Sequence, residues 1–329
     1  MLKEDFCGVD VGSVELTVSL HRGGEVVRRS FANTVAGHRA LRRLVSRRGH
    51  RVRVCLESTG VYGLDLALEL AQCEGVEVMV ANPRAVRRFA QALMKRGKSD
   101  RIDAEVLEQF AARMPFEPWK APSTSALQLR SVCRRIRVLT CSSTAEKNRL
   151  HAARASQTTS TVILEDLEEQ ILQLGQSVRR LTKEALRIIA SQPQLQQNLQ
   201  LLRTAKGIAQ TSAIQILGEL SVLSKDLDAR QWVAHAGLDP RHETSGTSVA
   251  KKPRITKAGN KYLRCALFMP ALTARQHDPN LKAFGDHLAA KGKIPIQVVV
   301  AVMRKLLVAI HAMLEKQQPF DGKQLFALT

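Results

Sequence analysis

Hydrophobic positions along the chain follow a strand pattern first and a helix pattern later. Two β-rich runs, at residues 5–10 and 14–20, are followed by a turn at Arg22-Gly23-Gly24 and a third run at 25–31, which together predict a three-strand meander. A basic helix at 36–48, a strand at 52–56, a helix at 62–73, a strand at 76–80 and a helix from Pro83 are predicted next. A meander followed by alternating βα units predicts an α/β domain over residues 1–120.

The spacing becomes purely helical from Ser125 to about Ile189. Apolar residues on the second half of this segment recur at intervals of three and four for more than three heptads, at Leu164, Leu167, Ile171, Leu174, Val178, Leu181, Ala185 and Ile188. A shorter series precedes it at Leu129, Val132, Ile136 and Leu139, and the polar stretch 156–161 is the predicted hairpin. One interpretation is a coiled-coil arm over residues 121–195, and the other is an amphipathic helix packed on a globular core. Either makes the segment an arm or an oligomerisation element rather than an active site.

The last part of the chain, residues 196–329, is predicted to be a mainly helical domain with one long irregular loop at 238–261. Its first segment, 201–213, resembles a helix-hairpin-helix, in which a turn containing glycine presents backbone N–H groups to a phosphate. The alternative is a glycine turn that only lets two helices pack.

Charge narrows the class of partner. The chain has 329 residues, with 50 Lys and Arg against 30 Asp and Glu, so its net charge is +20. Such an excess favours nucleic acid or an anionic membrane, and the membrane is disfavoured because no apolar stretch approaches about 18 residues and the N-terminus lacks the apolar core of a signal peptide. The six cysteines include no CxxC pair, which indicates free thiols and a cytoplasmic protein. Aromatic residues are only 4%, so contacts with the phosphate backbone should dominate binding.

Four acidic residues stand where a metal-dependent nuclease would need them. Asp10 and Glu57 each close an apolar run, and Asp100 and Asp103 form an i,i+3 pair that shares one helix face. Carboxylates that converge from separate elements make an oxygen-ligand Mg²⁺ site. Each residue also has an ordinary interpretation as a turn, a loop start or a helix cap, but their joint order suits a ribonuclease H-like domain.

Basic residues flank these carboxylates in two runs that contain no acid. The runs are Arg39, Arg42, Arg43, Arg47, Arg48, Arg51 and Arg53, and then Arg84, Arg87, Arg88, Lys95, Arg96 and Lys98. Solvated helix faces usually mix the two signs of charge, so unmixed runs favour phosphate contacts that position nucleic acid without reading its sequence.

A second constellation lies around Ser245-Gly246. From Arg241 to Arg264 there are seven Lys or Arg residues and one acidic residue. A hydroxyl beside glycine in a cationic segment suits a nucleophile for phosphoryl transfer, since the cations lower the energy of the alkoxide. The alternative is a loop that only binds phosphate.

These motifs together resemble the transposases of the IS110 class of insertion sequences over nearly the whole chain. The matching segments in the first half are 8–10, 57–62, 82–83 and 98–104, and those in the second half are 236–240, 245–246, 255–259 and Arg264. The resemblance implies a RuvC-like Asp-Glu-Asp-Asp domain, a coiled-coil arm and a C-terminal transposase domain with a catalytic serine.

The resemblance also implies a role for each candidate site residue. Asp10, Glu57, Asp100 and Asp103 would be the Mg²⁺ ligands and Ser245 the nucleophile. It also implies a noncoding bridge RNA that pairs with target and donor DNA, and a homo-oligomer in which dimers assemble to a tetramer. Two features differ from the usual pattern: Gly12-Ser13-Val14 stands where many relatives carry a Lys, and neighbouring hydroxyls crowd Ser245, so Thr244 and Ser248 stay open as attacking residues.

The sequence therefore predicts an RNA-guided DNA recombinase that works through a covalent serine–DNA intermediate assisted by Mg²⁺. One rival is a RuvC-like nuclease that uses metal-activated water, which leaves Ser245 without a role. The other is a non-catalytic nucleic-acid-binding scaffold, which leaves the four acids without a role.

Overall fold

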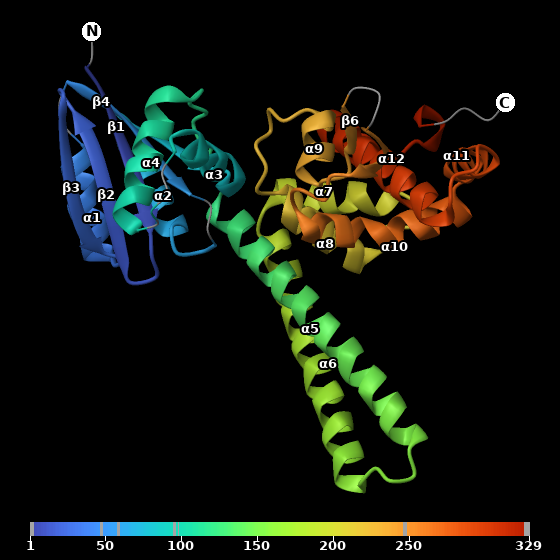
Figure 1. The fold of residues 1–329 in the computed structure, drawn as a ribbon. Helices are drawn as coiled ribbons and strands as arrows, with labels where there is room; N and C mark the ends of the chain where they lie inside the picture. Colours follow the sequence, from blue (N-terminus) through green and yellow to red (C-terminus); the bar gives the residue numbers. More distant parts are fainter. Residues whose placement is uncertain are drawn as a thin grey trace. The chain divides into compact units, whose positions relative to one another are not determined.

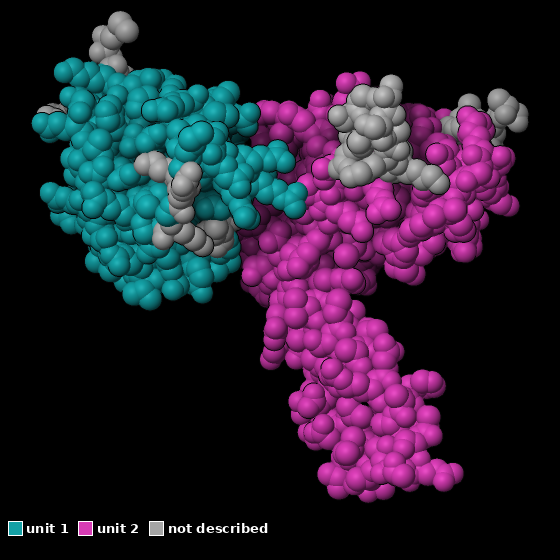
Figure 2. All heavy atoms as spheres, in the orientation of Figure 1, with its two compact units in different colours: residues 1–121 teal, residues 122–329 magenta. Residues whose placement is uncertain are grey.

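The computed structural model describes residues 3–46, 49–57, 60–94, 97, 99–245 and 249–325, and within the last two ranges the side chains of 242–245 and 249–253 are not described. The chain forms two compact units, residues 1–121 and residues 122–329, which Figure 2 distinguishes by colour. Each unit has its own core.

The first unit is a five-stranded sheet covered by helices on both faces (Figure 1). Its elements are β1 (Lys3–Val11), β2 (Glu15–Arg22), β3 (Glu25–Ala32), α1 (Val35–Val45), β4 (His50–Glu57), α2 (Leu64–Ala71), β5 (Val76–Ala81), α3 (Pro83–Ala92) and α4 (Asp100–Arg113). The strand order is β3-β2-β1-β4-β5; β1, β2 and β3 are antiparallel, whereas β4 is parallel to both β1 and β5. The predicted meander followed by βα units is confirmed.

Alternation along the strands divides the first unit into two apolar layers. On one face Cys7, Val9, Val54 and Leu56 pack with residues of α1 and α2. On the other face Cys55 and Met79 pack with residues of α3 and α4. Because side chains of a strand alternate, the even positions of β1 and the odd positions of β4 share the second face.

The second unit is mainly helical and contains one short β-ribbon. Its elements are α5 (Thr124–Ala155), α6 (Thr161–Ala190), α7 (Pro193–Thr204), α8 (Gln210–Leu220), α9 (Ala229–His235), β6 (Pro240–Ser245), β7 (Val249–Ile255), α10 (Lys261–His277), α11 (Pro279–Ala290), α12 (Pro295–Lys316) and a 3₁₀ turn η1 (Gly322–Gln324). Helices α5 and α6 pack along each other and project from the rest of the unit (Figures 1 and 2). Their base, which includes Leu129, Cys133 and Ile188, belongs to the same core as the C-terminal helices.

The heptad positions of α6 are shielded from solvent by other residues of the same chain. All eight of them on α6 are half-buried or buried, while the polar positions between them are mostly exposed. The 3-4 spacing therefore identified the face of α6 that is turned inward.

Two expectations for the second unit were wrong in detail. Residues 238–261 are not one irregular loop, because β6 and β7 pair antiparallel within them. In addition, one helix among the described residues, α12, is long and apolar enough to cross a membrane, although Arg304 and Lys305 interrupt its apolar sequence. Half of that apolar window is buried, and Val302, Leu306 and Ile310 of α12 are core residues of the unit.

The glycine turn between α7 and α8 serves packing. Gly207 has a φ of +96°, and a Cβ there would lie 2.5 Å from the Pro270 carbonyl oxygen and 2.8 Å from the Ala274 amide nitrogen of α10. The backbone of the turn is thus pressed onto α10, which supports the packing interpretation of segment 201–213.

Candidate active site

Asp10 and Glu57 lie at the ends of adjacent parallel strands. The parallel register pairs Val9 of β1 with Leu56 of β4, so Asp10 and Glu57 follow one residue later at the same edge of the sheet. Both residues occupy the face that α3 and α4 cover. The sequence predicted that each of these strands ends in a carboxylate, and the structure adds that the two strands are adjacent and parallel.

Gly8 allows helix α4, whose first turn carries the other two carboxylates, to lie directly against β1. It lies two residues before Asp10 on the same face of β1, and a Cβ there would be 2.1 Å from the Ala104 carbonyl oxygen and 2.2 Å from the Glu108 amide nitrogen. The backbone of α4 thus rests directly on β1, which only a glycine permits. Asp100 and Asp103 occupy the first turn of α4, whose N-cap residue Ser99 accepts a hydrogen bond from Ile102 N–H (3.4 Å).

An ion pair supports the seat of α4 on the sheet. Glu105 accepts a hydrogen bond from Arg28 Nε of β3 (2.7 Å) and lies 3.5 Å from Arg101 Nε. Gly8 contacts the backbone at Ala104 and Glu108 and Arg28 is paired with Glu105, so α4 is fixed against the sheet on two sides.

The electrostatics of Asp10 show that the four carboxylates share one field. The pKa of Asp10 is raised from 3.8 to about 6, first by burial and then by the negative charges of Asp103, Asp100 and Glu57, in that order. Backbone hydrogen bonding at Val11 opposes the shift. Like charges gathered at a half-buried position cost stability unless a cation neutralises them.

A second carboxylate of β1 shows the contrast. Asp5 is fully buried, but Arg22 Nε lies 2.5 Å and His50 Nδ1 lies 3.0 Å from its carboxylate oxygen. Asp5 is thus compensated by its own neighbours, as a structural ion pair must be. Asp10 instead experiences the charges of three other acids, and a carboxyl group whose pKa is raised by burial and by like charges is typical of a functional site.

The donor set suits a hard divalent cation. Four carboxylates supply only oxygen ligands, which Mg²⁺ prefers. Within the described parts of the chain, no group of three or more His, Cys, Asp or Glu side chains is drawn close enough to hold an ion as it stands. Charges interact over longer distances than metal ligands do, so the described carboxylates influence the pKa of Asp10 without forming a coordination sphere in this arrangement.

The basic runs are only partly available for phosphate. Arg51 is paired with Glu77, Arg53 lies 3.4 Å from carboxylate oxygens of Glu77 and Glu4, and Arg42 lies 3.8 Å from Glu69. These arginines have no acidic neighbours in the sequence but have acidic partners in the structure, so the prediction that their charges are uncompensated is wrong. Arg47, Arg48, Lys95, Arg96 and Lys98 lie outside the described residues. The side chains of Arg84, Arg87 and Arg88 on α3 are exposed, as contact with phosphate requires.

Ser245 occupies the end of a β-ribbon in the second unit. Strand β6 ends at Ser245, whose backbone is paired with Val249 of β7 across the connection 246–248. The hydroxyl of Ser245 and its candidate rivals at Thr244 and Ser248 lie outside the described side chains. The predicted nucleophile is therefore at the tip of a two-stranded ribbon rather than within a long loop.

Two of the sequence motifs lock together at the base of this ribbon. Thr256 donates from its amide to the Asp239 carbonyl (3.0 Å) and from its hydroxyl to the Asp239 carboxylate (2.7 Å). Lys257 N–H donates to the Gly237 carbonyl (3.2 Å), and Arg264 Nη1 donates to the Ala236 carbonyl (2.7 Å). The short motifs at 236–240 and 255–259 are therefore hydrogen-bonded to each other, and we call this pair of segments the clamp.

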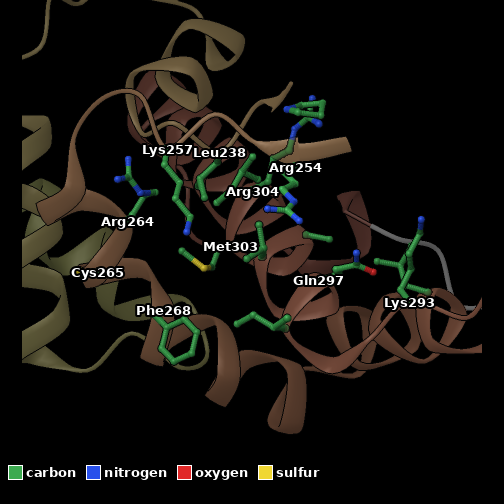
Figure 3. A pocket seen from close by; sticks show the side chains of 16 residues that line it. Leu238, Arg254, Lys257, Arg264, Cys265, Phe268, Lys293, Gln297, Met303 and Arg304 are labelled. Carbon is green, nitrogen blue, oxygen red and sulfur yellow. The ribbon is translucent and has the colours of Figure 1, made fainter. Parts of the chain in front are cut away.

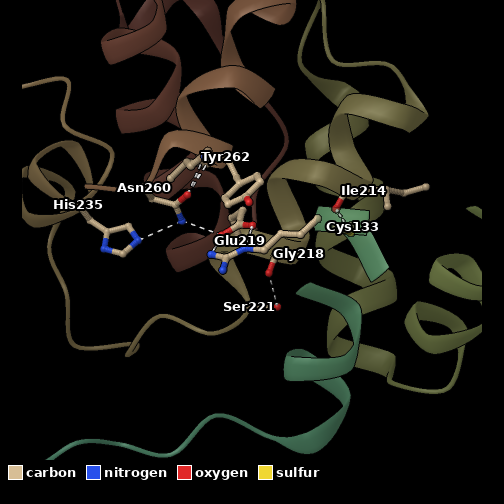
Figure 4. A network of polar contacts seen from close by, with 10 residues as sticks. Cys133, Ile214, Gly218, Glu219, Ser221, His235, Asn260 and Tyr262 are labelled. Atoms are coloured by element: carbon tan, nitrogen blue, oxygen red, sulfur yellow. Dashed lines mark hydrogen bonds and ion pairs between the residues drawn. The ribbon is translucent and has the colours of Figure 1, made fainter. Parts of the chain in front are cut away.

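A buried carboxylate extends this clamp to the base of α5 (Figure 4). Glu219 of α8 is 2% exposed, accepts two hydrogen bonds of 2.8 Å from Arg134, and accepts one of 2.7 Å from Asn260 Nδ2. Asn260 in turn caps α10 by accepting from Tyr262 N–H and Leu263 N–H. The nearby His235 has a lowered pKa, chiefly because it is buried. Sequence reasoning missed Glu219 and Arg134, since a lone acid within an apolar helix has no distinctive spacing.

The fold and its acidic cluster define a class of protein. A mixed α/β sheet with carboxylates at the ends of β1 and β4, followed by helices, fits a nucleic-acid-processing enzyme with a RuvC-like domain of the Asp-Glu-Asp-Asp type. Residues 7–154 match the family model of the IS110 transposase with that domain, and residues 199–286 match the transposase model of the IS116/IS110/IS902 family. The chain belongs to the IS110 family of transposases and is a DNA recombinase of that family.

Individual relatives agree with this assignment. The chain is 28% identical over 274 residues to the pilin gene-inverting proteins of Moraxella bovis and of Moraxella lacunata, with 83% of both chains covered in each case. It is 27% identical over 95 residues to an uncharacterized 43.6 kDa protein of the insertion element IS110 from Streptomyces coelicolor, which covers 29% of this chain and 23% of that protein.

Proposed function

We propose that this transposase is an RNA-guided recombinase that exchanges DNA strands through a covalent serine–DNA intermediate. The observation that supports the enzymatic part is the raised pKa of Asp10, to which burial and then the charges of Asp103, Asp100 and Glu57 contribute. The pilin gene-inverting relatives support strand exchange in particular, because inversion must rejoin every end that it cuts.

The four carboxylates would hold Mg²⁺. When bound, the ion would stabilise negative charge that develops on the phosphate oxygens during transfer. The carboxylates themselves bind and orient: Asp10 and Glu57 lie on strand ends of the sheet, and α4 is fixed by its contact with Gly8. Rigid elements of this kind hold ligands more accurately than loops do.

Ser245 would make the covalent bond. Its hydroxyl oxygen attacks a phosphorus atom of the DNA backbone and loses its proton, an O–P bond forms, and the departing sugar oxygen takes up a proton. In the reverse step the sugar hydroxyl of another strand attacks the phosphoserine and frees the serine. One phosphoester bond is exchanged for another, so rejoining needs no ATP.

The remaining parts of the proposal concern assembly. The carboxylates and Ser245 belong to different units, so the reaction draws on both, and a site composed by two protomers would suit a dimer that assembles to a tetramer. We assign residues 1–120 to the RuvC-like domain, 121–195 to a coiled-coil arm that mediates self-association, and 196–329 to the transposase domain. A net charge of +20 suits simultaneous binding of donor DNA, target DNA and a bridge RNA.

Trapping the DNA adduct tests the proposal. Incubation with labelled DNA and Mg²⁺ should give a protein–DNA species that survives denaturing electrophoresis, and Ser245→Ala should remove it while DNA binding is kept. Ser221→Ala is the matched control, since that hydroxyl donates to the Gly218 carbonyl (3.3 Å) at the end of α8. Asp103→Asn should abolish cleavage and adduct together.

The rivals give different products. Free DNA ends without any adduct would identify a nuclease that uses water, and no cleavage under any condition would identify a scaffold. An adduct mapped to Thr244 or Ser248 would change the residue and keep the mechanism.

A further inference from the structure

A groove in the second unit lies next to the ribbon that carries Ser245. It has a volume of about 840 Å³ and is lined by residues of β6, β7, α10 and α12, with further contributions from the segments beside them (Figure 3). Pro240 of β6 and Arg254 and Ile255 of β7 belong to its wall. The groove is therefore adjacent to the base of the ribbon whose tip bears the proposed nucleophile.

Cations surround this groove. Among the described residues that line it, five of sixteen are Lys or Arg and none is acidic. Lys257 and Arg264 stand on one side in Figure 3, Arg254 and Arg304 in the middle, and Lys293 at the far end. An arrangement of this kind suits a chain of phosphates rather than a single anion.

The floor of the groove is apolar. Leu238 and Met303 are buried there, Phe268 and Val300 are half-buried, and Ile296 is 52% exposed at the edge. A surface that binds only the phosphates of a duplex needs no apolar floor, because the paired bases are stacked inside the double helix. The volume is within the range of about 300–1,000 Å³ that is typical of sites for small organic ligands, so a nucleotide fits.

We infer that the groove holds an unpaired nucleotide of the DNA strand undergoing exchange, with its base on the apolar floor and its flanking phosphates on the cationic rim. The inference rests on the proposed function, since it is the position of the ribbon that selects DNA as the occupant. Strands must leave their duplex before they can be exchanged, and a site that accepts an unstacked base stabilises that opened state. Gln297 is the lining amide, and its side chain can donate to a base edge.

A native thiol reports occupancy of the groove. Cys265 is free, exposed and part of the lining, whereas Cys141 is free and exposed on α5. Cys7, Cys55 and Cys133 are buried and their thiol pKa values are raised by burial, so they react slowly with alkylating reagents. Mass spectrometry of the alkylated full-length protein resolves each cysteine separately, so Cys265 in the groove is compared directly with Cys141 on the arm.

The experiment uses Ser245→Ala protein, in which the proposed covalent step cannot occur. The probes are oligothymidylate of about ten nucleotides, an abasic deoxyribose-phosphate oligomer of the same length and charge, and oligouridylate. Oligothymidylate should slow alkylation of Cys265 several-fold and leave Cys141 unchanged. It should also bind roughly tenfold more tightly than the abasic oligomer, as expected for one base in contact with an apolar surface.

Two variants distinguish contacts with the base from contacts with the phosphates. Val300→Trp fills the groove without changing the charge and should remove the preference for oligothymidylate over the abasic oligomer. Arg304→Gln should lower the affinity for both probes equally. It should also reduce the slope of log affinity against log salt concentration by about 0.7, the value for one phosphate contact of a single strand. The matched charge control is Lys282→Gln, an exposed residue of α11 that should change neither.

Two results would overturn the inference. One is equal binding of oligothymidylate and the abasic oligomer with Cys265 alkylated at its free rate. The other is protection of Cys265 by oligouridylate and none by oligothymidylate, which would assign the groove to RNA. Adduct formation in the parent protein is measured separately. A negative result for base binding in the groove therefore does not affect the test of the serine step, and a negative result for the adduct does not affect the test of the groove.

Discussion

Replacement of Gly8 by alanine should separate the two halves of the acidic site. The added Cβ would lie 2.1 Å from the Ala104 carbonyl oxygen and 2.2 Å from the Glu108 amide nitrogen, and real Cβ atoms do not approach backbone this closely. Neither contact is with the end of a flexible side chain, so α4 itself must move away from β1. Asp103, one residue before Ala104, moves with it.

The cost follows from the geometry. Forcing an extra methyl group into a well-packed interior costs about 1–3 kcal/mol when side chains can adjust. Since a helix backbone must shift here, we expect about 3 kcal/mol. A displacement of about 1 Å in a catalytic group can cost about a hundredfold in rate, so Mg²⁺-dependent cleavage should fall at least that far.

The assay exploits the tryptophans. The chain has two, Trp119 against the core of the first unit and Trp232 in the core of the second. Urea unfolding of Gly8→Ala in a Trp232→Phe background, followed by fluorescence, reports the first unit alone. The matched control is Gly63→Ala, where a Cβ would meet its nearest neighbour, Val11 Cγ2, at an ordinary 3.4 Å. Stability within about 0.5 kcal/mol of the parent, or unchanged cleavage, would refute the assignment of Gly8 as the seat of α4.

Three further predictions concern charge and assembly. Asp10→Asn should stabilise the metal-free protein above pH 6 by about 1 kcal/mol. The pKa of Asp10 is raised to about 6, so its ionised form lowers the stability of the folded state, and the expected gain is reduced because the side chain is partly exposed. That gain should vanish as the pH falls toward 3.8 in urea titrations, and Glu74→Gln, an exposed residue at the opposite edge of the sheet, should show none of it. Glu219→Gln should weaken the second unit by about 2–3 kcal/mol, seen through Trp232 fluorescence, because the arginine that it holds loses its counter-charge; equal unfolding midpoints would contradict the role of that network. Leu174→Glu should lower the oligomeric mass in light scattering, and an unchanged mass with a lower melting temperature would assign the seam to the α5–α6 hairpin alone.

Much of the first unit followed from the sequence because its signals are local. Apolar runs that end in Asp10 and Glu57 predicted strands with carboxylates at one edge, and the i,i+3 spacing of Asp100 and Asp103 predicted one helix face. Gly8 is the informative residue between them. Its place two positions before Asp10 was visible in the sequence, but only the structure shows that α4 rests on it.

Charge runs were less informative, since sequence order does not determine which side chains meet. Arg51 and Arg53 sit in a run without acids, yet Glu77 reaches both from the neighbouring strand β5. Counting charges along the chain predicted the kind of partner, while the pairing of strands decided which arginines are already compensated.

The second unit depended most on tertiary structure. The segment that includes β6 and β7 is polar and interrupted by Pro240, Gly246 and Pro253, a composition that predicts a loop. It forms a ribbon because its strands pair with each other and because the motifs at 236–240 and 255–259 clamp its base. The sequence by itself determined the strand ends, the helix faces and the excess of positive charge, all of which depend on near neighbours along the chain. Which backbone rests on Gly8, which acid compensates which arginine and where the cationic groove opens depend on contacts between distant residues, and those only the tertiary structure could decide.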